Sequence, residues 1–141
     1  MTTFEQVTFI RATPDQVWDA LTSEQQTADF WGHSNLSDWA VGSRWEHLRT
    51  DGSGIADVEG EVVESERPSR LAMTFGEGSV VAFDIEPFHD IVRVVITHTD
   101  LPDGQYRNAE HGWSSVASNL KTLLETGRTL PQPPWEMPLR R

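Results

Sequence analysis

Residues 108–127, NAEHGWSSVASNLKTLLETG, decide the fold, because they predict one long helix after a middle that is patterned almost entirely as β-strands. Asn108 can cap the start of this helix, and Gly127 can end it in the left-handed conformation. The C-terminal half should pack tightly. The N-terminal half has mostly small side chains, including Gly112, and its one bulky residue is Trp113. A helix that packs on a sheet and has small side chains at one end can leave a void there. The apolar residues at helical spacing are Trp113, Val116, Ala117, Leu120, Leu123 and Leu124.

The segment 44–100 alternates apolar and polar residues with a period of two, which is typical of antiparallel strands with one face in water. Its short turns predict a meander whose single apolar face needs a cover, and the helix at 108–127 is the only long cover available. One strand places Asp57, Glu59 and Glu61 on the face opposite Ala56, Val58, Gly60 and Val62. We interpret the three carboxylates as ordinary solvated surface charge.

Before this meander, residues 4–11 alternate and predict a first strand. Thr13 then begins a short helix as a capping residue, with a proline at the first helical position. Ser23 repeats the capping pattern, so a second short helix is expected to end at about Trp31. The polar and glycine-containing segment 32–43 is expected to be a loop.

The composition narrows the possible functions. A chain of 141 residues suits one domain, and the absence of cysteine excludes disulfides, thiolate metal sites and cysteine nucleophiles. A net charge of −11 opposes binding to nucleic acid or to an anionic membrane surface. No apolar run approaches the roughly 20 residues that span a bilayer, and no secretory signal is evident. We therefore expect a cytoplasmic protein, either monomeric or a homodimer.

The proline-rich tail at 128–141, RTLPQPPWEMPLRR, is predicted to form neither a helix nor an inner strand. It should be an extended segment that is either mobile or laid on the surface through Trp135.

Several short motifs together resemble a known superfamily. Their order and spacing over residues 4–127 are similar to the START-like superfamily, also called SRPBCC or birch-pollen-allergen-like. Within it, the chain resembles bacterial single-domain proteins similar to the C-terminal domain of the activator of the heat-shock-protein-90 ATPase. The motifs are IRATPDQVWDAL at 10–21, DFWG at 29–32, VGSRW at 41–45, GEVVE at 60–64, PSRL at 68–71, VVITH at 94–98 and GWSSV at 112–116.

The resemblance implies an α+β helix-grip fold. In this fold a curved antiparallel sheet of about six strands wraps around the long C-terminal helix and an internal cavity, with two short helices after the first strand. A START-like domain is then expected over residues 1–127, followed by the tail at 128–141. The superfamily includes lipid and hormone binders, polyketide cyclases and chaperone activators, so the resemblance does not imply one activity. It implies no cofactor.

Six tryptophans are many for a small domain, and those near the presumed cavity suit a pocket for a small, mostly apolar molecule. The alternative is that they simply fill the core, which we expect for Trp18. The candidate ligand-binding residues are Trp31, Trp45, Phe75, Phe83, His98, Trp113, Val116 and Ala117.

His98 ends an otherwise apolar strand face, so it is expected to point inward. It is either a polar anchor or general acid/base for a bound molecule, or a core histidine bonded to a backbone carbonyl. We assign no catalytic residue, because the chain has no Gly-x-Ser-x-Gly elbow. No metal site is predicted either, because the histidines lack metal-binding spacing. They are His33, His47, His89, His98 and His111.

Three functions follow as hypotheses. The first is binding of a small hydrophobic ligand, of unspecified identity, between the sheet and the C-terminal helix. The second is a chaperone co-factor, or another protein-binding module that docks through the acidic strand face. The third is a cyclase or hydrolase that uses His98 with a cavity water.

Overall fold

The computed structural model describes residues 2–76 and 78–138. The described chain forms three α-helices, seven strands and one short 3-10 helix. In chain order they are β1 (Thr2–Ile10), α1 (Pro14–Thr22), α2 (Glu24–Trp31), β2 (His33–Ser37), β3 (Arg44–Arg49), β4 (Ala56–Glu66), β5 (Arg70–Thr74), β6 (Val80–Phe88), β7 (Ile91–Leu101), α3 (Tyr106–Thr126) and η1 (Pro134–Glu136).

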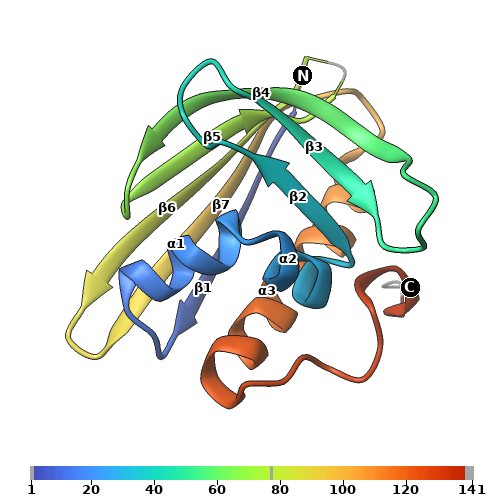
Figure 1. The fold of residues 1–141 in the computed structure, drawn as a ribbon. Coiled ribbons are helices and arrows are strands. Elements are labelled where there is room, and N and C mark those ends of the chain that lie inside the picture. Colours follow the sequence, from blue (N-terminus) through green and yellow to red (C-terminus); the bar gives the residue numbers. More distant parts are fainter. Residues whose placement is uncertain (1, 77, 139–141) are drawn as a thin grey trace.

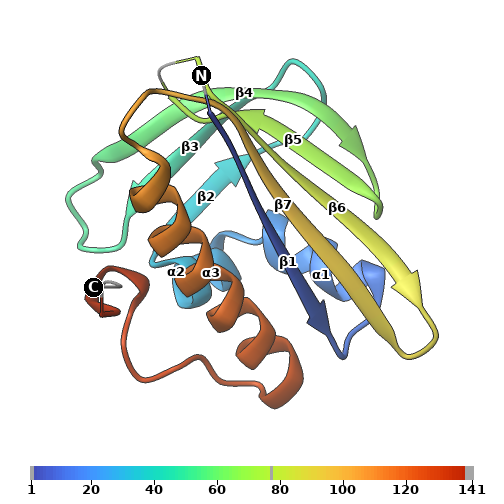
Figure 2. The ribbon, with the colours of Figure 1, turned by 180° about the vertical axis from the view of Figure 1, so that it is seen from behind.

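The strands form one antiparallel sheet in the order β1-β7-β6-β5-β4-β3-β2. The first strand, β1, therefore pairs with the last, β7. All the other neighbouring strands are consecutive in the sequence and are joined by hairpins. The sheet curves over the helices, which all lie on its concave side (Figure 1). Seen from behind, α3 runs beside β1 and β7 (Figure 2). This arrangement confirms the predicted α+β helix-grip architecture.

Local capping signals set the two short helices as predicted. Thr13 and Gln16 form a reciprocal capping box at the start of α1. The Ser23 hydroxyl accepts the N–H of Gln26 at the start of α2. The second helix ends at Trp31, where Gly32 takes a φ of 80°. Each of these signals lies within four residues of the helix end that it sets, so the sequence carries the information directly.

The prediction of a loop over residues 32–43 is wrong in its first part. Residues His33–Ser37 form the edge strand β2, which pairs with β3 from His33↔Arg49 to Ser37↔Trp45. The sequence HSNLS has almost no β-branched or aromatic residues, so only the pairing with β3 makes it a strand. The sheet consequently has one strand more than the expected six.

The long helix begins earlier than expected. It starts at Tyr106, and Asn108 is not its cap but donates from Nδ2 to Gln105 Oε1 at 3.0 Å. Its predicted end is confirmed, because Gly127 has a φ of 82° and donates its N–H to Leu123 O. The middle of α3 is its most buried part, whereas Leu123 and Leu124 are only half-buried. In Figure 2 the C-terminal end of α3 extends past the end of β1, which leaves that end without a sheet on one side.

The tail turns back across the surface after α3 (Figure 2). Leu130 donates its N–H to Asn119 Oδ1, and the ring of Trp135 lies against Gly32. The prediction that the tail lies on the surface through Trp135 is confirmed. The prediction that it contains no helix is wrong by one 3-10 turn at Pro134–Glu136, because a proline is tolerated in a first turn. The last residues of the predicted tail, 139–141, lie outside the described residues. None of the helices described is long and apolar enough to cross a membrane.

Candidate functional site

A pocket of about 420 Å³ lies between the first turns of α3 and the inner face of the sheet. We call it the α3 pocket. Five of the predicted residues line it, namely Trp31, Phe75, His98, Trp113 and Val116. The other lining residues are Asp57, Val58, Gly76, Ser79, Leu101, Pro102, Gln105, Asn108, Ala109 and Gly112. The half of the long helix with small side chains thus does leave a hollow, but this hollow opens to solvent and is not the internal cavity that was expected.

Three aromatic rings form the floor of the α3 pocket. The ring centroids of Trp31 and Trp113 lie 5.2 Å apart, and that of Phe75 lies 5.8 Å from Trp113 and 6.4 Å from Trp31. These spacings are those of favourable aromatic contacts. The rings fill the middle of the molecule, so the pocket lies at one end of it. It opens to solvent beside the exposed residues Gly76 and Gln105.

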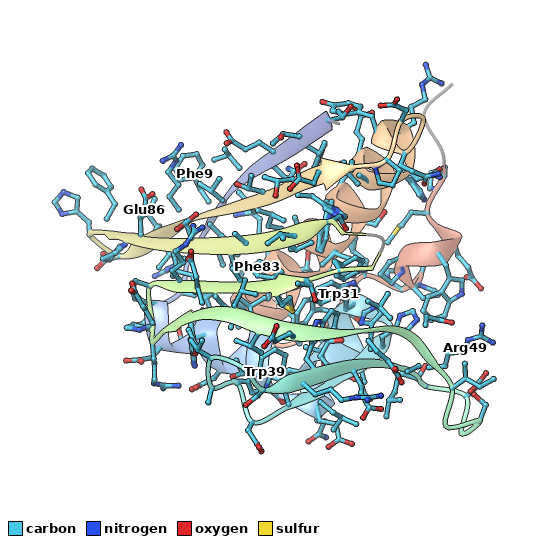
Figure 3. All side chains as sticks on the ribbon, turned by 90° about the horizontal axis from the view of Figure 1, so that it is seen from above. Phe9, Trp31, Trp39, Arg49, Phe83 and Glu86 are labelled. Carbon is cyan, nitrogen blue, oxygen red and sulfur yellow. The ribbon has the colours of Figure 1, made fainter. Side chains whose placement is uncertain are left out.

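The other three predicted residues do not reach the α3 pocket. Trp45 and Phe83 are fully buried, and Ala117 is also buried in the core. Trp45 packs behind Phe75 with centroids 5.6 Å apart, and Phe83 lies 6.0 Å from Trp31. Figure 3 shows Trp31 and Phe83 together under the middle of the sheet. Trp45 and Phe83 therefore support the lining rings rather than line the pocket themselves.

His98 is held in a short chain of hydrogen bonds. The indole Nε1–H of Trp113 donates to His98 Nδ1 at 3.0 Å, so the imidazole proton lies on Nε2. That Nε2–H donates to Ser79 Oγ at 3.0 Å, and the Ser79 hydroxyl lies 2.9 Å from the carbonyl oxygens of both Phe75 and Gly76. Burial lowers the pKa of His98 to about 4, so the ring is neutral at neutral pH.

These hydrogen bonds favour the second interpretation of His98, although the ring also lines the α3 pocket. The ring is a satisfied core histidine, although its partners are Trp113 and Ser79 instead of a backbone carbonyl. Both nitrogens are engaged, so neither is free in this arrangement to take a proton from a bound molecule. The geometry therefore gives no support to the cyclase or hydrolase hypothesis.

A β-bulge in β4 changes the direction of one carboxylate. His47 pairs with Val58 and Leu48 pairs with Ala56, so Asp57 is the extra residue between two successive pairs. An extra residue reverses the alternation of the strand at that point, and bulges commonly occur beside functional sites. Asp57 therefore lies at the rim of the α3 pocket instead of on the outer face, and it is still exposed to solvent, as expected of a surface carboxylate. Ala56 correspondingly loses its predicted place on the inner face.

Asp57 is fixed by two partners from neighbouring strands. His33 Nε2 lies 2.8 Å from its Oδ2, and Arg49 donates from Nε to its Oδ1 at 2.8 Å. These hydrogen bonds, first that of His33 and then that of Arg49, hold the pKa of Asp57 below its ordinary value. Glu59 and Glu61 are likewise exposed, and they lie on the outer face as predicted.

A buried polar cluster that the sequence did not reveal lies next to Asp57. The rings of His33 and His47 stack with centroids 3.9 Å apart, and His47 Nδ1 lies 2.5 Å from Asn35 Oδ1. Burial above all, and then the charge of His33, lowers the pKa of His47 to about 3. The histidines come from two strands, and Asn35 belongs to the strand that was expected to be a loop. Among the described residues, no group of three or more His, Asp or Glu side chains could hold a metal ion.

A second hollow of about 480 Å³, which we call the tail groove, lies between α3 and the tail. It is lined mainly by polar residues of α3, among them His111, Ser114 and Ser118, with Leu130 and Met137 from the tail. Among the described residues that line it there is no tryptophan, tyrosine or phenylalanine. A mostly apolar molecule therefore fits the smaller α3 pocket better.

Comparison with known proteins gives one family and several similar structures. A family model described as "Activator of Hsp90 ATPase homolog 1-like protein" matches residues 11–125. No curated protein sequence matches the chain.

Among solved structures, the protein SSP2350 from Staphylococcus saprophyticus is 19% identical with a TM-score of 0.79, and the match covers 92% of this chain and 96% of that one. The Aha1 dimer from Colwellia psychrerythraea is 20% identical with a TM-score of 0.74, covering 90% and 98% of the two chains. PFC0360w, an HSP90 activator from Plasmodium falciparum, is 20% identical with a TM-score of 0.67, covering 81% and 89%. Identities this low show a shared fold alone.

Proposed function

The chain belongs to the family of activator of Hsp90 ATPase homolog 1-like proteins, and from this membership we propose that it is a cytoplasmic START-like domain that binds a small, mostly apolar molecule in the α3 pocket. The binding domain spans residues 1–127 in this proposal, and the tail at 128–141 lies outside it. Trp31, Phe75 and Trp113 contact the apolar body of the ligand. Trp45 and Phe83 hold these rings in place from behind, and Ala117 is part of the buried core.

The observation that carries this proposal is Gly112, a glycine in the interior of α3. Glycine costs a helix interior about 1 kcal/mol relative to alanine. No packing reason accounts for it here, because a Cβ atom at Gly112 would meet nothing within 4 Å. The missing side chain instead opens onto the α3 pocket. Residues that go against local helix preference without a packing reason are expected mainly at functional sites. Glycine at this position therefore indicates that the open space beside it has a function.

We expect Gly112→Ala to raise the free energy of unfolding by about 0.5–1 kcal/mol, because it lowers the entropy of the unfolded chain without a clash. We expect Gly112→Leu to fill the α3 pocket and abolish ligand binding while the domain stays folded. Urea unfolding measures the first effect. A thermal-shift panel of hydrophobic probes, with native mass spectrometry of the protein as purified, measures the second.

Ser118→Leu is the matched control, since Ser118 is an exposed residue of the same helix that lines only the tail groove. It should leave probe binding unchanged. If Ser118→Leu removed binding and Gly112→Leu did not, the ligand would sit in the tail groove and the proposal would fail.

The family match favours a second candidate function, the binding of a chaperone of the heat-shock-protein-90 class. The Plasmodium falciparum protein of the same fold is an HSP90 activator, and the Colwellia psychrerythraea protein is a dimer. In this case the purified domain should increase the ATPase rate of the chaperone from its own organism, and the increase should saturate as the chaperone becomes fully bound. An unchanged rate, together with no complex in sedimentation analysis, would exclude it. The same sedimentation runs distinguish a monomer from a homodimer.

A further inference from the structure

We propose that the α3 pocket selects ligands whose polar end donates a hydrogen bond, above all an ammonium group, and that Asp57 makes this selection. The inference deepens the proposed function and rests on it. It assigns a chemical class to the polar end of the ligand, whereas the aromatic rings account only for its apolar body.

The other polar groups of the α3 pocket are already paired with one another. Trp113, His98 and Ser79 form the closed chain of hydrogen bonds described above. At the opening, Asn108 donates to Gln105 Oε1 at 3.0 Å. A ligand that used Trp113, His98 or Ser79 would first have to break an existing bond, and the polar atom left without its partner would be costly. Gln105 and Asn108 are exposed and uncharged, so a ligand bond to either of them would only replace a bond to water.

Asp57 is different because its carboxylate still has capacity to accept. Each oxygen has one partner within hydrogen-bond distance, Arg49 on Oδ1 and His33 on Oδ2. An ionised carboxylate offers about four lone-pair sites, so about two remain free. The same two partners fix the side chain, which therefore loses little conformational freedom when a ligand binds. A fixed acceptor at the edge of an aromatic pocket favours a donor in a defined position.

The charges around the α3 pocket point in the same direction. Among the described lining residues there is no lysine or arginine, and His98 is neutral. Arg49 contacts Asp57 but does not line the pocket, and Figure 3 shows it at the periphery of the molecule. A carboxylate ligand would therefore meet Asp57 with no cation among the described lining residues, and the guanidinium of Arg49 beside it is already paired with Asp57. The faces of Trp31 and Trp113 attract cations in addition.

Three probes that share one naphthalene ring test this selection: 2-(1-naphthyl)ethylamine, 1-naphthaleneethanol and 1-naphthaleneacetate. Titration calorimetry at neutral pH, supported by saturation-transfer NMR, gives the affinity of each. We expect the amine to bind tightest and the acetate about tenfold or more weakly than the amine. The alcohol, a neutral donor, should lie between them.

Asp57→Asn should lower the affinity of the amine about tenfold and remove its advantage over the acetate. Glu59→Gln is the matched control, because this substitution also removes one negative charge and Glu59 lies on the outer face of the same strand. It should leave all three affinities unchanged. Arg49→Gln provides a second variant that keeps the carboxylate and removes its positive partner, and it should increase the preference for the amine.

The outcomes separate this inference from the proposed function. If all three probes bound equally, and Gly112→Leu still abolished binding, the proposed function would stand and the role of Asp57 would be overturned. Tighter binding of the acetate would also overturn it, and would place the polar end at the N-terminal end of α3, whose partial positive charge favours anions. If no probe bound to any variant, the proposed function itself would fail.

Discussion

Replacing Gly60 with Ala is expected to destabilise the folded domain by about 2–4 kcal/mol. Gly60 in β4 pairs with Trp45 in β3, and a Cβ atom at Gly60 would lie closer than 3.0 Å to Thr74 O, Thr74 Oγ1 and Trp45 Nε1. Trp45 is fully buried and donates its indole N–H to Thr74 O at 2.8 Å. The added methyl group would push the ring away from that carbonyl, so the cost combines overpacking with a buried donor left unpaired.

Urea unfolding followed by tryptophan fluorescence measures this loss. The informative comparison is with Gly112→Ala, the same chemical change at a position with no neighbour within 4 Å. The two variants should shift the unfolding midpoint in opposite directions. A shift of both midpoints to higher urea would show that Trp45 can move aside at little cost, and would contradict the close packing between β3 and β4.

The free energy of unfolding is expected to fall steeply as the pH drops from about 6.5 towards 4. His47 and His98 have pKa values of about 3 and about 4 in the folded state, against 6.5 for an unperturbed histidine. The unfolded chain therefore takes up protons first as the pH falls, and protonation favours unfolding. Each buried histidine contributes a slope of up to about 1.4 kcal/mol per pH unit in this window.

Asp57 contributes little to a loss in this range. The pKa of Asp57 is lowered in the folded state, so its contribution to stability is present above its unfolded pKa and is lost only at lower pH. Urea titrations at several values between pH 7 and pH 4.5 measure the slope. His98→Gln should reduce it by about half, because one of the two buried imidazoles is removed.

His89→Asn is the control for this experiment. His89 is an exposed residue with a φ of 52°, a conformation that asparagine also tolerates. It should leave the slope unchanged. A flat dependence of the unfolding free energy on pH in the unsubstituted protein would show that the two buried rings take up protons without unfolding, and would contradict their enclosure.

The features that were predictable from the sequence are those whose cause lies within a few residues. The capping residues Thr13 and Ser23 set the starts of α1 and α2, and Gly127 sets the end of α3. The inward direction of His98 followed from the alternation along its own strand, which is unbroken there. The weak sequence HSNLS had no such local cause, because β2 exists only through its pairing with β3.

The candidate site divides along the same line. By itself, the sequence determined that a long helix, with small side chains in its first half, covers a curved sheet. It also determined that aromatic side chains gather near that half. Both follow from periodicity and side-chain size, which are local properties of the sequence. Only the tertiary structure decided which rings line the α3 pocket and which stand behind them. It also decided that Asp57 lies at the rim of this pocket beside His33 and Arg49. A bulge depends on the register between two strands, and register is a relation between distant residues that no local pattern contains.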